Sequence, residues 1–173
     1  MWVFGYGSLM WDGWEHRFGC TRTVPAILPA FQRDFNKASV RNWGTRQNPG
    51  PTLGLTPAAK GECRGLAFEF SDAERERILA ALRARESPSF ELQNRDVDLV
   101  SSGRVTAVVP LNNRSSGTFI GGQPLEERVR LALRARGECG TCIDYVKAIR
   151  TKLVELQIQD PAVERFWKLV SEE

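Results

Sequence analysis

Residues 1–11 read MWVFGYGSLMW, an apolar run that contains two glycines around a tyrosine, followed by a serine. The segment from Trp2 to Tyr6 has the apolar character of a buried strand, and Gly7 to Leu9 has the composition of the turn after it. Glycine lets the backbone approach a ligand closely, and successive N–H groups in such a turn can bind an anion. The turn is therefore either an ordinary tight turn or a binding site for a carboxylate or an oxyanion.

The turn does not match the common nucleotide-binding or nucleophile motifs. No Lys-Ser or Lys-Thr pair follows at the spacing of a phosphate-binding loop, and Met10 stands where the dinucleotide fingerprint has its third glycine. Ser8 is not part of a Gly-x-Ser-x-Gly motif, and His16 is the one histidine of the sequence. We therefore expect Ser8 to bind or orient a ligand rather than to act as a nucleophile.

Length and composition indicate one globular domain covering residues 1–173. The net charge of +3 comes from scattered basic residues, which gives no case for nucleic-acid binding. No apolar run is long enough to span a bilayer, and no basic segment precedes the first apolar run, so we expect neither a membrane span nor a signal peptide. Four cysteines in a chain of this length do not make a disulfide scaffold, which favours a cytoplasmic location.

Outward from the first strand, the residue pattern predicts several further strands. Pro25 and Pro29 interrupt the apolar segment Val24 to Phe35, which predicts an irregular or edge strand there. Turn-forming residues from Asn42 to Pro51 predict a long loop. The remaining expected strands, the last two forming a hairpin across Ser101-Ser102-Gly103, are Leu53 to Leu55, Arg64 to Phe70, Arg95 to Val100 and Arg104 to Leu111.

Helices are expected in the middle of the chain and, above all, in its last third. Ser71 and Glu74 have the spacing of a capping box, which predicts a helix to about Arg85. Further helices are predicted over residues 125–136, 141–156 and, after the Asp160-Pro161 cap, to about Val170. Strands before helices indicate the α+β class rather than alternating α/β.

Glu86 is the acidic residue whose position is unusual. At 100° per residue it lies about 20° from Leu79 and about 40° from Leu82, on the apolar face of the helix after Ser71. The neighbouring Arg83 and Arg85 are expected to point to other faces. A carboxylate buried on such a face suits proton transfer near neutral pH. The alternative is that the helix ends at Arg85 and leaves Glu86 in solvent.

Cys139 and Cys142 form a C-x-x-C pair, which could be a redox pair or half of a zinc site completed by Cys20 and Cys63. A second C-x-x-C is missing, and the pair precedes a late helix rather than lying in a βαβ unit. We therefore expect structural thiols and no metal site.

Several segments together resemble the ChaC-like γ-glutamylcyclotransferases, in the order found in that family. They are VFGYGSLMW, GTRQNPGPTLGLTP, CRGLAFEF, ALRARE and GTCIDYVKAIRTKLVELQIQDP. The resemblance implies a small, partly closed mixed β-barrel surrounded by helices. It also implies cleavage of a γ-glutamyl amide, usually glutathione, to 5-oxoproline and a free amine such as cysteinylglycine. No metal or organic cofactor and no obligate protein partner is expected.

The same resemblance assigns roles to particular residues. Glu86 matches the catalytic glutamate, which would act as general base and then general acid. Tyr145 matches a tyrosine of the late helix that reaches the substrate cavity. The substrate-binding turn falls on Gly5, Tyr6, Gly7, Ser8, Leu9 and Met10.

The sequence departs from the glutathione-specific members at three places. Ser87-Pro88-Ser89-Phe90 replaces a lysine-glycine-glycine-tyrosine type of segment, Pro51 replaces an arginine, and Cys142 replaces a polar residue. Two alternatives follow: a cyclotransferase for another γ-glutamyl amine or amino acid, or a non-catalytic relative that binds a ligand in the same cavity.

Overall fold

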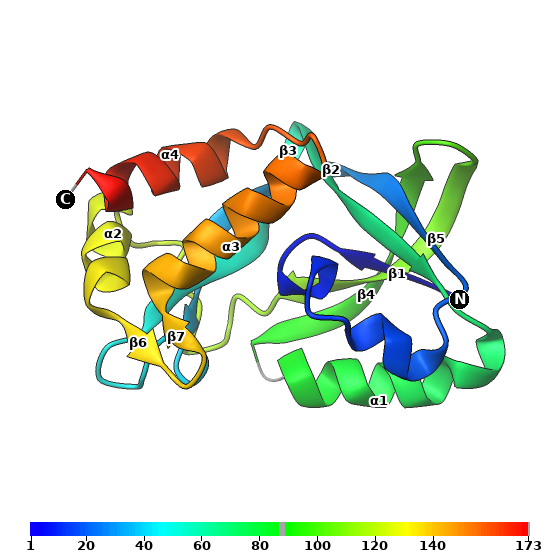
Figure 1. Ribbon diagram of the computed structural model, residues 1–173, viewed down its shortest axis with the longest axis horizontal. Helices are drawn as coiled ribbons and strands as arrows, with labels where there is room; N and C mark the ends of the chain where they lie inside the picture. The colour runs from blue at the N-terminus through cyan, green and yellow to red at the C-terminus, as the bar shows by residue number, and fades with distance from the viewer. Residues whose placement is uncertain (87–88, 173) are drawn as a thin grey trace. The chain divides into compact units, whose positions relative to one another are not determined.

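The computed structural model of the protein describes residues 1–86 and 89–172, and its elements are labelled in Figure 1. The chain divides into two compact units. The barrel unit comprises Met1–Gln32 and Thr56–Asn113, and the helical unit comprises Arg33–Leu55 and Arg114–Glu173. That the whole chain is one domain stays a prediction.

Five strands form a closed barrel in the order β1-β3-β2-β4-β5, which confirms the expected mixed barrel. Strand β1 is antiparallel to β3 and parallel to β5. In the parallel pair, Trp2 pairs with Ala107 and Val3 pairs with Val108. Buried apolar side chains fill the unit, among them Val3, Phe4, Phe68, Val97 and Val109. The strands are β1 (Trp2–Gly5), β2 (Arg22–Ser39), β3 (Gly50–Glu69), β4 (Phe90–Leu99) and β5 (Gly103–Asn112).

Strands β2 and β3 are far longer than the sequence pattern predicts. The expected irregular strand is part of one 18-residue strand, and the two short strands expected after the loop are parts of one 20-residue strand. Proline lacks an N–H, but the carbonyl of Pro25 still accepts a hydrogen bond from Val100 N at 3.0 Å. After Pro29 the strand continues through Ala30, which takes a positive φ of 61°. Pairing with neighbours on the barrel therefore overrides the local interruptions.

The middle helix begins with the 3₁₀ turn η3 (Asp72–Glu74) and continues as α1 (Arg75–Glu86). Ser71 caps it as expected, but its side chain accepts from Ala73 N rather than from Glu74 N. Ile78 and Leu82 are fully buried, which fixes one face of the helix against the barrel unit. Strands β4 and β5 then form the expected hairpin, paired from Phe90–Asn112 to Leu99–Gly103.

The helical unit contains the three helices of the last third of the chain, and Figure 1 shows α3 and α4 side by side. Their core includes Phe35 and Phe166, whose rings stack with centroids 4.0 Å apart. The helix expected over residues 125–136 ends at Arg134, because Arg136–Gly137 (β6) pairs instead with Gly140–Thr141 (β7). The three helices are α2 (Leu125–Arg134), α3 (Cys142–Glu155) and α4 (Pro161–Ser171).

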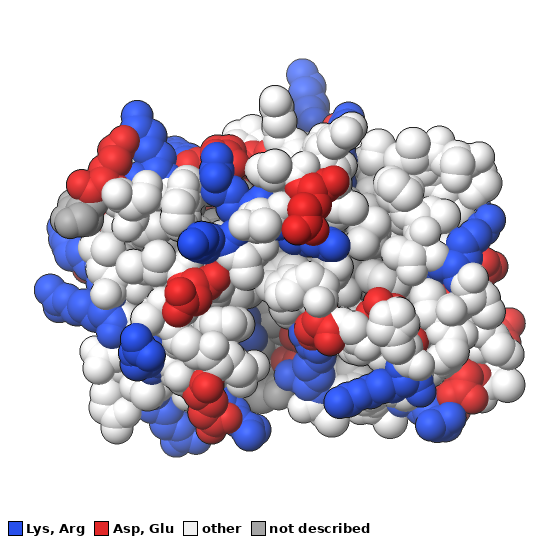
Figure 2. Space-filling model, viewed as in Figure 1, with Lys and Arg blue, Asp and Glu red and all other residues white. Residues whose placement is uncertain are grey.

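On the face drawn in Figure 2, basic and acidic side chains are interspersed, without a large area of one sign. Among residues 1–86 and 89–172, no helix combines the length and the apolar character needed to cross a bilayer.

Candidate functional site

The GYGSL segment leaves the barrel at the end of β1 and forms one turn of 3₁₀ helix, η1 (Ser8–Met10). Met10 N donates to Gly7 O at 2.9 Å, and Trp11 N donates to Ser8 O at 3.1 Å. Gly65 of β3 has to be a glycine, because a Cβ on it would lie 2.3 Å from the carbonyl oxygen of Gly5. The start of the GYGSL segment therefore lies directly against β3.

Three side chains of the turn anchor it to the core. Tyr6 donates from its hydroxyl to Pro110 O at 2.8 Å, and Leu9 and Met10 are buried. Trp14 Nε1 donates to Leu9 O at 3.1 Å, which fixes the backbone from the other side. The parts of the turn that are not fully buried are Gly7 and Ser8.

Glu86 is the last residue of α1, so the helix does reach it, and its side chain is 13% exposed. The alternative of a solvated glutamate beyond a frayed helix end is wrong. The structure brings Glu86 and the GYGSL turn together within the barrel unit, through the side chain of Arg85. This is the cluster that the separate sequence features suggested.

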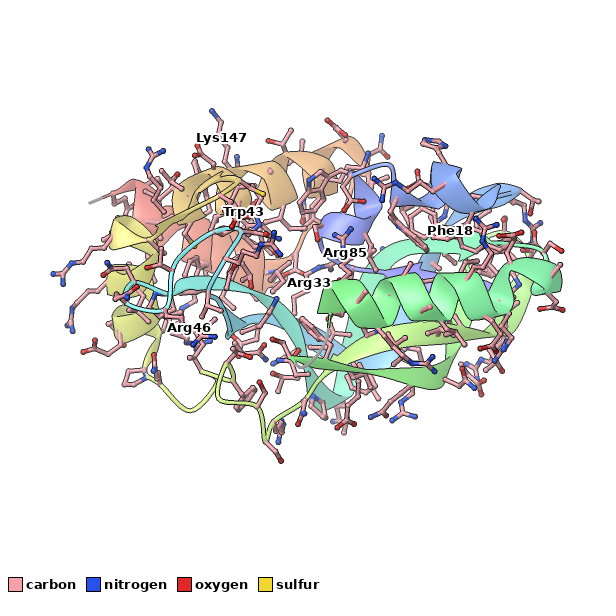
Figure 3. All side chains as sticks on the ribbon, turned by 90° about the horizontal axis from the view of Figure 1, so that it is seen from below. Phe18, Arg33, Trp43, Arg46, Arg85 and Lys147 are labelled. Carbon is pink, nitrogen blue, oxygen red and sulfur yellow. The ribbon has the colours of Figure 1, made fainter. Side chains whose placement is uncertain are left out.

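Arg85 contacts three partners with the three nitrogens of its guanidinium group. Nε donates to Glu86 Oε1 at 3.0 Å, Nη2 donates to Ser8 Oγ at 2.7 Å, and Nη1 pairs with Asp12 Oδ2. The expectation that Arg85 points away from Glu86 is wrong, because a long arginine side chain can turn back along the helix end. Figure 3 shows Arg85 at the end of α1, directed toward the N-terminal segment.

The charges of this cluster do not cancel. Asp12 and Glu86 carry one negative charge each when ionised, and Arg85 carries one positive charge, so the formal sum is −1. Within the described part of the chain, the second carboxylate oxygen of Glu86 has no hydrogen-bond partner. Ser8 Oγ accepts from Arg85, so the hydroxyl proton of Ser8 remains available for donation. Among the described residues, the cluster thus offers a carboxylate oxygen without a partner and an oriented hydroxyl donor.

Neither Asp12 nor Arg85 is singled out by the sequence pattern. Asp12 follows the apolar run in a short turn, and Arg85 is one of several arginines in α1. The adjacency of Arg85 and Glu86 in the sequence was a usable signal, but helical geometry alone assigns neighbouring side chains to different faces.

Tyr145 belongs to the helical unit and is described there by itself. Its hydroxyl oxygen accepts from Leu53 N at 3.1 Å, and its ring lies 5.5 Å from that of Trp43. The side chain is buried, with 4% of its residue surface exposed. Its contact with substrate stays a prediction.

The C-x-x-C cysteines differ in their environments. Cys139 is exposed, whereas Cys142 is buried and donates from Sγ to Pro51 O at 3.1 Å. Burial raises the pKa of the Cys142 thiol to about 12. Each described cysteine is a free thiol, and the described residues contain no group of three or more His, Cys, Asp or Glu side chains placed to bind a metal ion.

Of the segment after Glu86, Ser87 and Pro88 lie outside the described residues. Phe90 begins β4, where it pairs with Asn112, and it is only 9% exposed. A phenylalanine in this segment could offer an apolar surface to a ligand, but the ring of Phe90 does not, because the barrel buries it.

Comparison with known proteins gives consistent matches along the chain. Gamma-glutamylcyclotransferase 2-3 of Arabidopsis thaliana is 29% identical over 171 residues, covering 94% of this chain and 84% of the plant protein. The glutathione-specific gamma-glutamylcyclotransferase of Escherichia coli K12 is 28% identical over 163 residues, covering 92% of this chain and 68% of the bacterial protein.

A solved structure supports the fold. The crystal structure of a gamma-glutamyl cyclotransferase specific to glutathione from yeast superposes with a TM-score of 0.90 at 18% identity, covering 99% of this chain and 96% of the yeast chain. The model of the ChaC-like protein family matches residues 1–173. Because this family model covers the whole chain, the chain belongs to the ChaC-like family.

Proposed function

We propose that this protein is a γ-glutamylcyclotransferase that converts glutathione into 5-oxoproline and cysteinylglycine. The observation that carries the proposal is the joining of the Glu86 carboxylate to Ser8 of the GYGSL turn by the Arg85 side chain. The Arabidopsis relative is named a gamma-glutamylcyclotransferase, and the Escherichia coli relative is named a glutathione-specific gamma-glutamylcyclotransferase. The substrate is a small molecule, and the chemistry needs one base and a set of hydrogen-bond donors.

Glu86 would move the proton in both halves of the reaction. Its free carboxylate oxygen accepts a proton from the α-ammonium group of the γ-glutamyl substrate, which turns that nitrogen into a nucleophile. The nitrogen then attacks the γ-carbonyl carbon and closes the five-membered ring of 5-oxoproline. When the amide C–N bond breaks, the proton on Glu86 passes to the departing amine. The ring nitrogen loses its second proton as it becomes the lactam N–H, and the departing amine takes up this proton too and leaves as an ammonium group. Glu86 is thus returned to its ionised form, and no oxidant, reductant or metal takes part in the balance.

The turn would hold the parts of the substrate that become or remain negative. The Ser8 hydroxyl and the N–H groups at the start of η1 can donate to the α-carboxylate or to the oxyanion formed on the γ-carbonyl. The buried anchors Tyr6, Leu9 and Met10 keep these donors in place. Tyr145 is proposed as a further residue that reaches the substrate. A curled substrate held between donors and base gains reactivity from proximity.

We place the reaction in the cytoplasm. The described cysteines are free thiols, and such thiols persist in a reducing compartment.

Incubation of the protein with reduced glutathione tests the proposal directly. The expected products are 5-oxoproline and cysteinylglycine in equal amounts, measured by chromatography and mass spectrometry. The reaction should proceed equally in the presence of a chelator, because a carboxylate and hydrogen-bond donors supply every step. Failure to form 5-oxoproline from glutathione or from any of a set of γ-glutamyl dipeptides and amines would favour the non-catalytic alternative.

A further inference from the structure

We infer that Arg85 is a positioning residue for the reaction and that its planar guanidinium fork, rather than its charge alone, sets the geometry of the site. This inference rests on the proposed function. Arg85 uses Nε, Nη1 and Nη2 for three different partners, namely Glu86, Asp12 and Ser8. The two groups assigned to the reaction, the base and the hydroxyl donor, are thereby fixed relative to each other by one rigid side-chain group.

The directions of these bonds matter because both reaction groups sit at ends of elements. Glu86 is the last residue of α1, and Ser8 is the first residue of a single helical turn. Both side chains are only partly buried, so packing alone does not fix their rotamers. The bonds of 3.0 Å to Glu86 Oε1 and 2.7 Å to Ser8 Oγ supply the missing restraint.

Asp12 completes the arrangement from the opposite side of the guanidinium group. Its Oδ2 pairs with Arg85 Nη1, and its Oδ1 accepts from Trp14 N at 3.3 Å. Arg85 is 31% exposed and Asp12 is 29% exposed at the side chain, so the cluster is reached from solvent. Arg85 is thus held by a backbone-anchored carboxylate on one side and holds the base and the hydroxyl on the other.

A lysine could supply the charge of Arg85 but not its geometry. Its ammonium group is a point charge on a flexible stem, whereas guanidinium donates in fixed directions within one plane. A structural role that depends only on charge predicts rescue by lysine. A positioning role predicts that lysine does not restore the rate, because a misplacement of the base by about 1 Å costs about 100-fold in rate.

The test compares kcat and KM for glutathione in the wild type, Arg85→Lys, Arg85→Ala and Arg83→Ala. The last variant is the matched control, because Arg83 is an exposed arginine on the same helix. We expect kcat to fall about 10- to 100-fold in both Arg85 variants with KM changed less than about threefold, and Arg83→Ala to match the wild type. Added guanidinium at about 50 mM, far below unfolding concentrations, should restore part of the kcat of Arg85→Ala and leave Arg83→Ala unchanged.

Near-normal kcat in Arg85→Lys, or no response of folded Arg85→Ala to guanidinium, would overturn the positioning role while leaving the proposed function intact. If Arg85→Ala does not fold, Arg85→Lys decides, since it keeps the side-chain stem and the charge beside Asp12. An inactive wild type would instead refute the proposed function, so the two failures are distinguishable.

Discussion

Arg85 and Ser8 lie 77 residues apart in the sequence, yet Arg85 Nη2 donates to Ser8 Oγ at 2.7 Å. This bond ties the end of α1 to the turn after β1. Together with the bond from Arg85 to Glu86, it joins the proposed base to the proposed donors of the turn within the barrel unit. The consequences for catalysis can be measured one group at a time.

Replacement of Glu86 by glutamine should remove most of the turnover and leave the fold intact. Glutamine is nearly isosteric and can still accept from Arg85 Nε, but it cannot take the ammonium proton. The expected loss in kcat is on the order of 100-fold or more, as for a general base. The measurement is the rate of 5-oxoproline release at saturating glutathione.

Circular dichroism and urea unfolding of Glu86→Gln provide the control for its fold. Since the side chain is 13% exposed and the substitution keeps its shape, the unfolding midpoint should stay close to that of the wild type. A folded Glu86→Gln protein with near-normal turnover would refute the assignment of Glu86 as the base.

Asp12→Asn tests the charge of the cluster separately from its geometry. Asparagine keeps an oxygen that can accept from Arg85, but the formal charge of the cluster changes from −1 to 0. The substrate ammonium group should then be held less strongly, with KM about three- to tenfold higher, corresponding to roughly 0.6–1.4 kcal/mol at a partly exposed site.

The salt dependence of Asp12→Asn gives the control. Added NaCl screens attraction between charges, so KM of the wild type should rise with salt more steeply than KM of the variant. An unchanged KM with equal salt dependence would show that Asp12 does not contribute charge to binding.

The fold was predictable where local pattern and burial agree. The first strand, the β4–β5 hairpin and the cap at Asp160 follow directly from residue types that have one favourable arrangement. The continuity of β2 was not predictable, because Pro25 and Pro29 signal interruption locally. The continuity of β3 was not predictable either, because pairing across the barrel depends on distant segments. The resemblance, rather than periodicity, supplied the barrel itself.

The GYGSL turn and Glu86 were predictable as parts of one site, but the contacts of Arg85 and Asp12 that join them were not. The turn and Glu86 each stand out, since one is glycine-rich and the other is an acid on an apolar face. The contacts of Arg85 were not foreseen, because the rotamer of a long side chain depends on partners from another element. Asp12 has no distinguishing pattern at all, and only the folded chain brings it to Arg85.

The thiols of Cys139 and Cys142 should react very differently with an alkylating reagent at pH 8. The raised pKa of Cys142, about 12, leaves about one thiol in 10⁴ ionised at that pH, and the group is also buried. Cys139 is exposed and should be modified readily. Mass spectrometry of peptides after brief labelling, with and without urea, measures both.

The same pKa shift has a defined sign for stability. The folded protein keeps the Cys142 proton above the ordinary thiol pKa of 9.0, whereas the unfolded chain loses it. The resulting contribution to stability is therefore present below pH 9 and is lost as the pH rises toward about 12.

In the labelling experiment, modification of Cys142 in the native protein as fast as Cys139 would contradict the buried, protonated thiol. It would also reopen the redox interpretation of the pair.

The last prediction concerns the leaving amine. The protein should be highly selective for the γ-glutamyl end of its substrate. In the proposed mechanism the ammonium and carboxylate groups of that end contact Glu86 and the GYGSL turn. A site built on polar partners rejects analogues that leave those partners unpaired. The segment Ser87-Pro88-Ser89-Phe90 carries no cation for the glycine carboxylate of glutathione, and Phe90 is buried in β4. We therefore expect weak selectivity at the amine end.

The measurement is kcat/KM for glutathione, for γ-glutamyl-alanine and for a γ-glutamyl amine without a carboxylate. The ratio of glutathione to each of the others should stay below about 100-fold, or about 2.7 kcal/mol of differential transition-state binding. A larger preference for glutathione would show that residues outside this segment recognise cysteinylglycine, and the prediction would then be wrong.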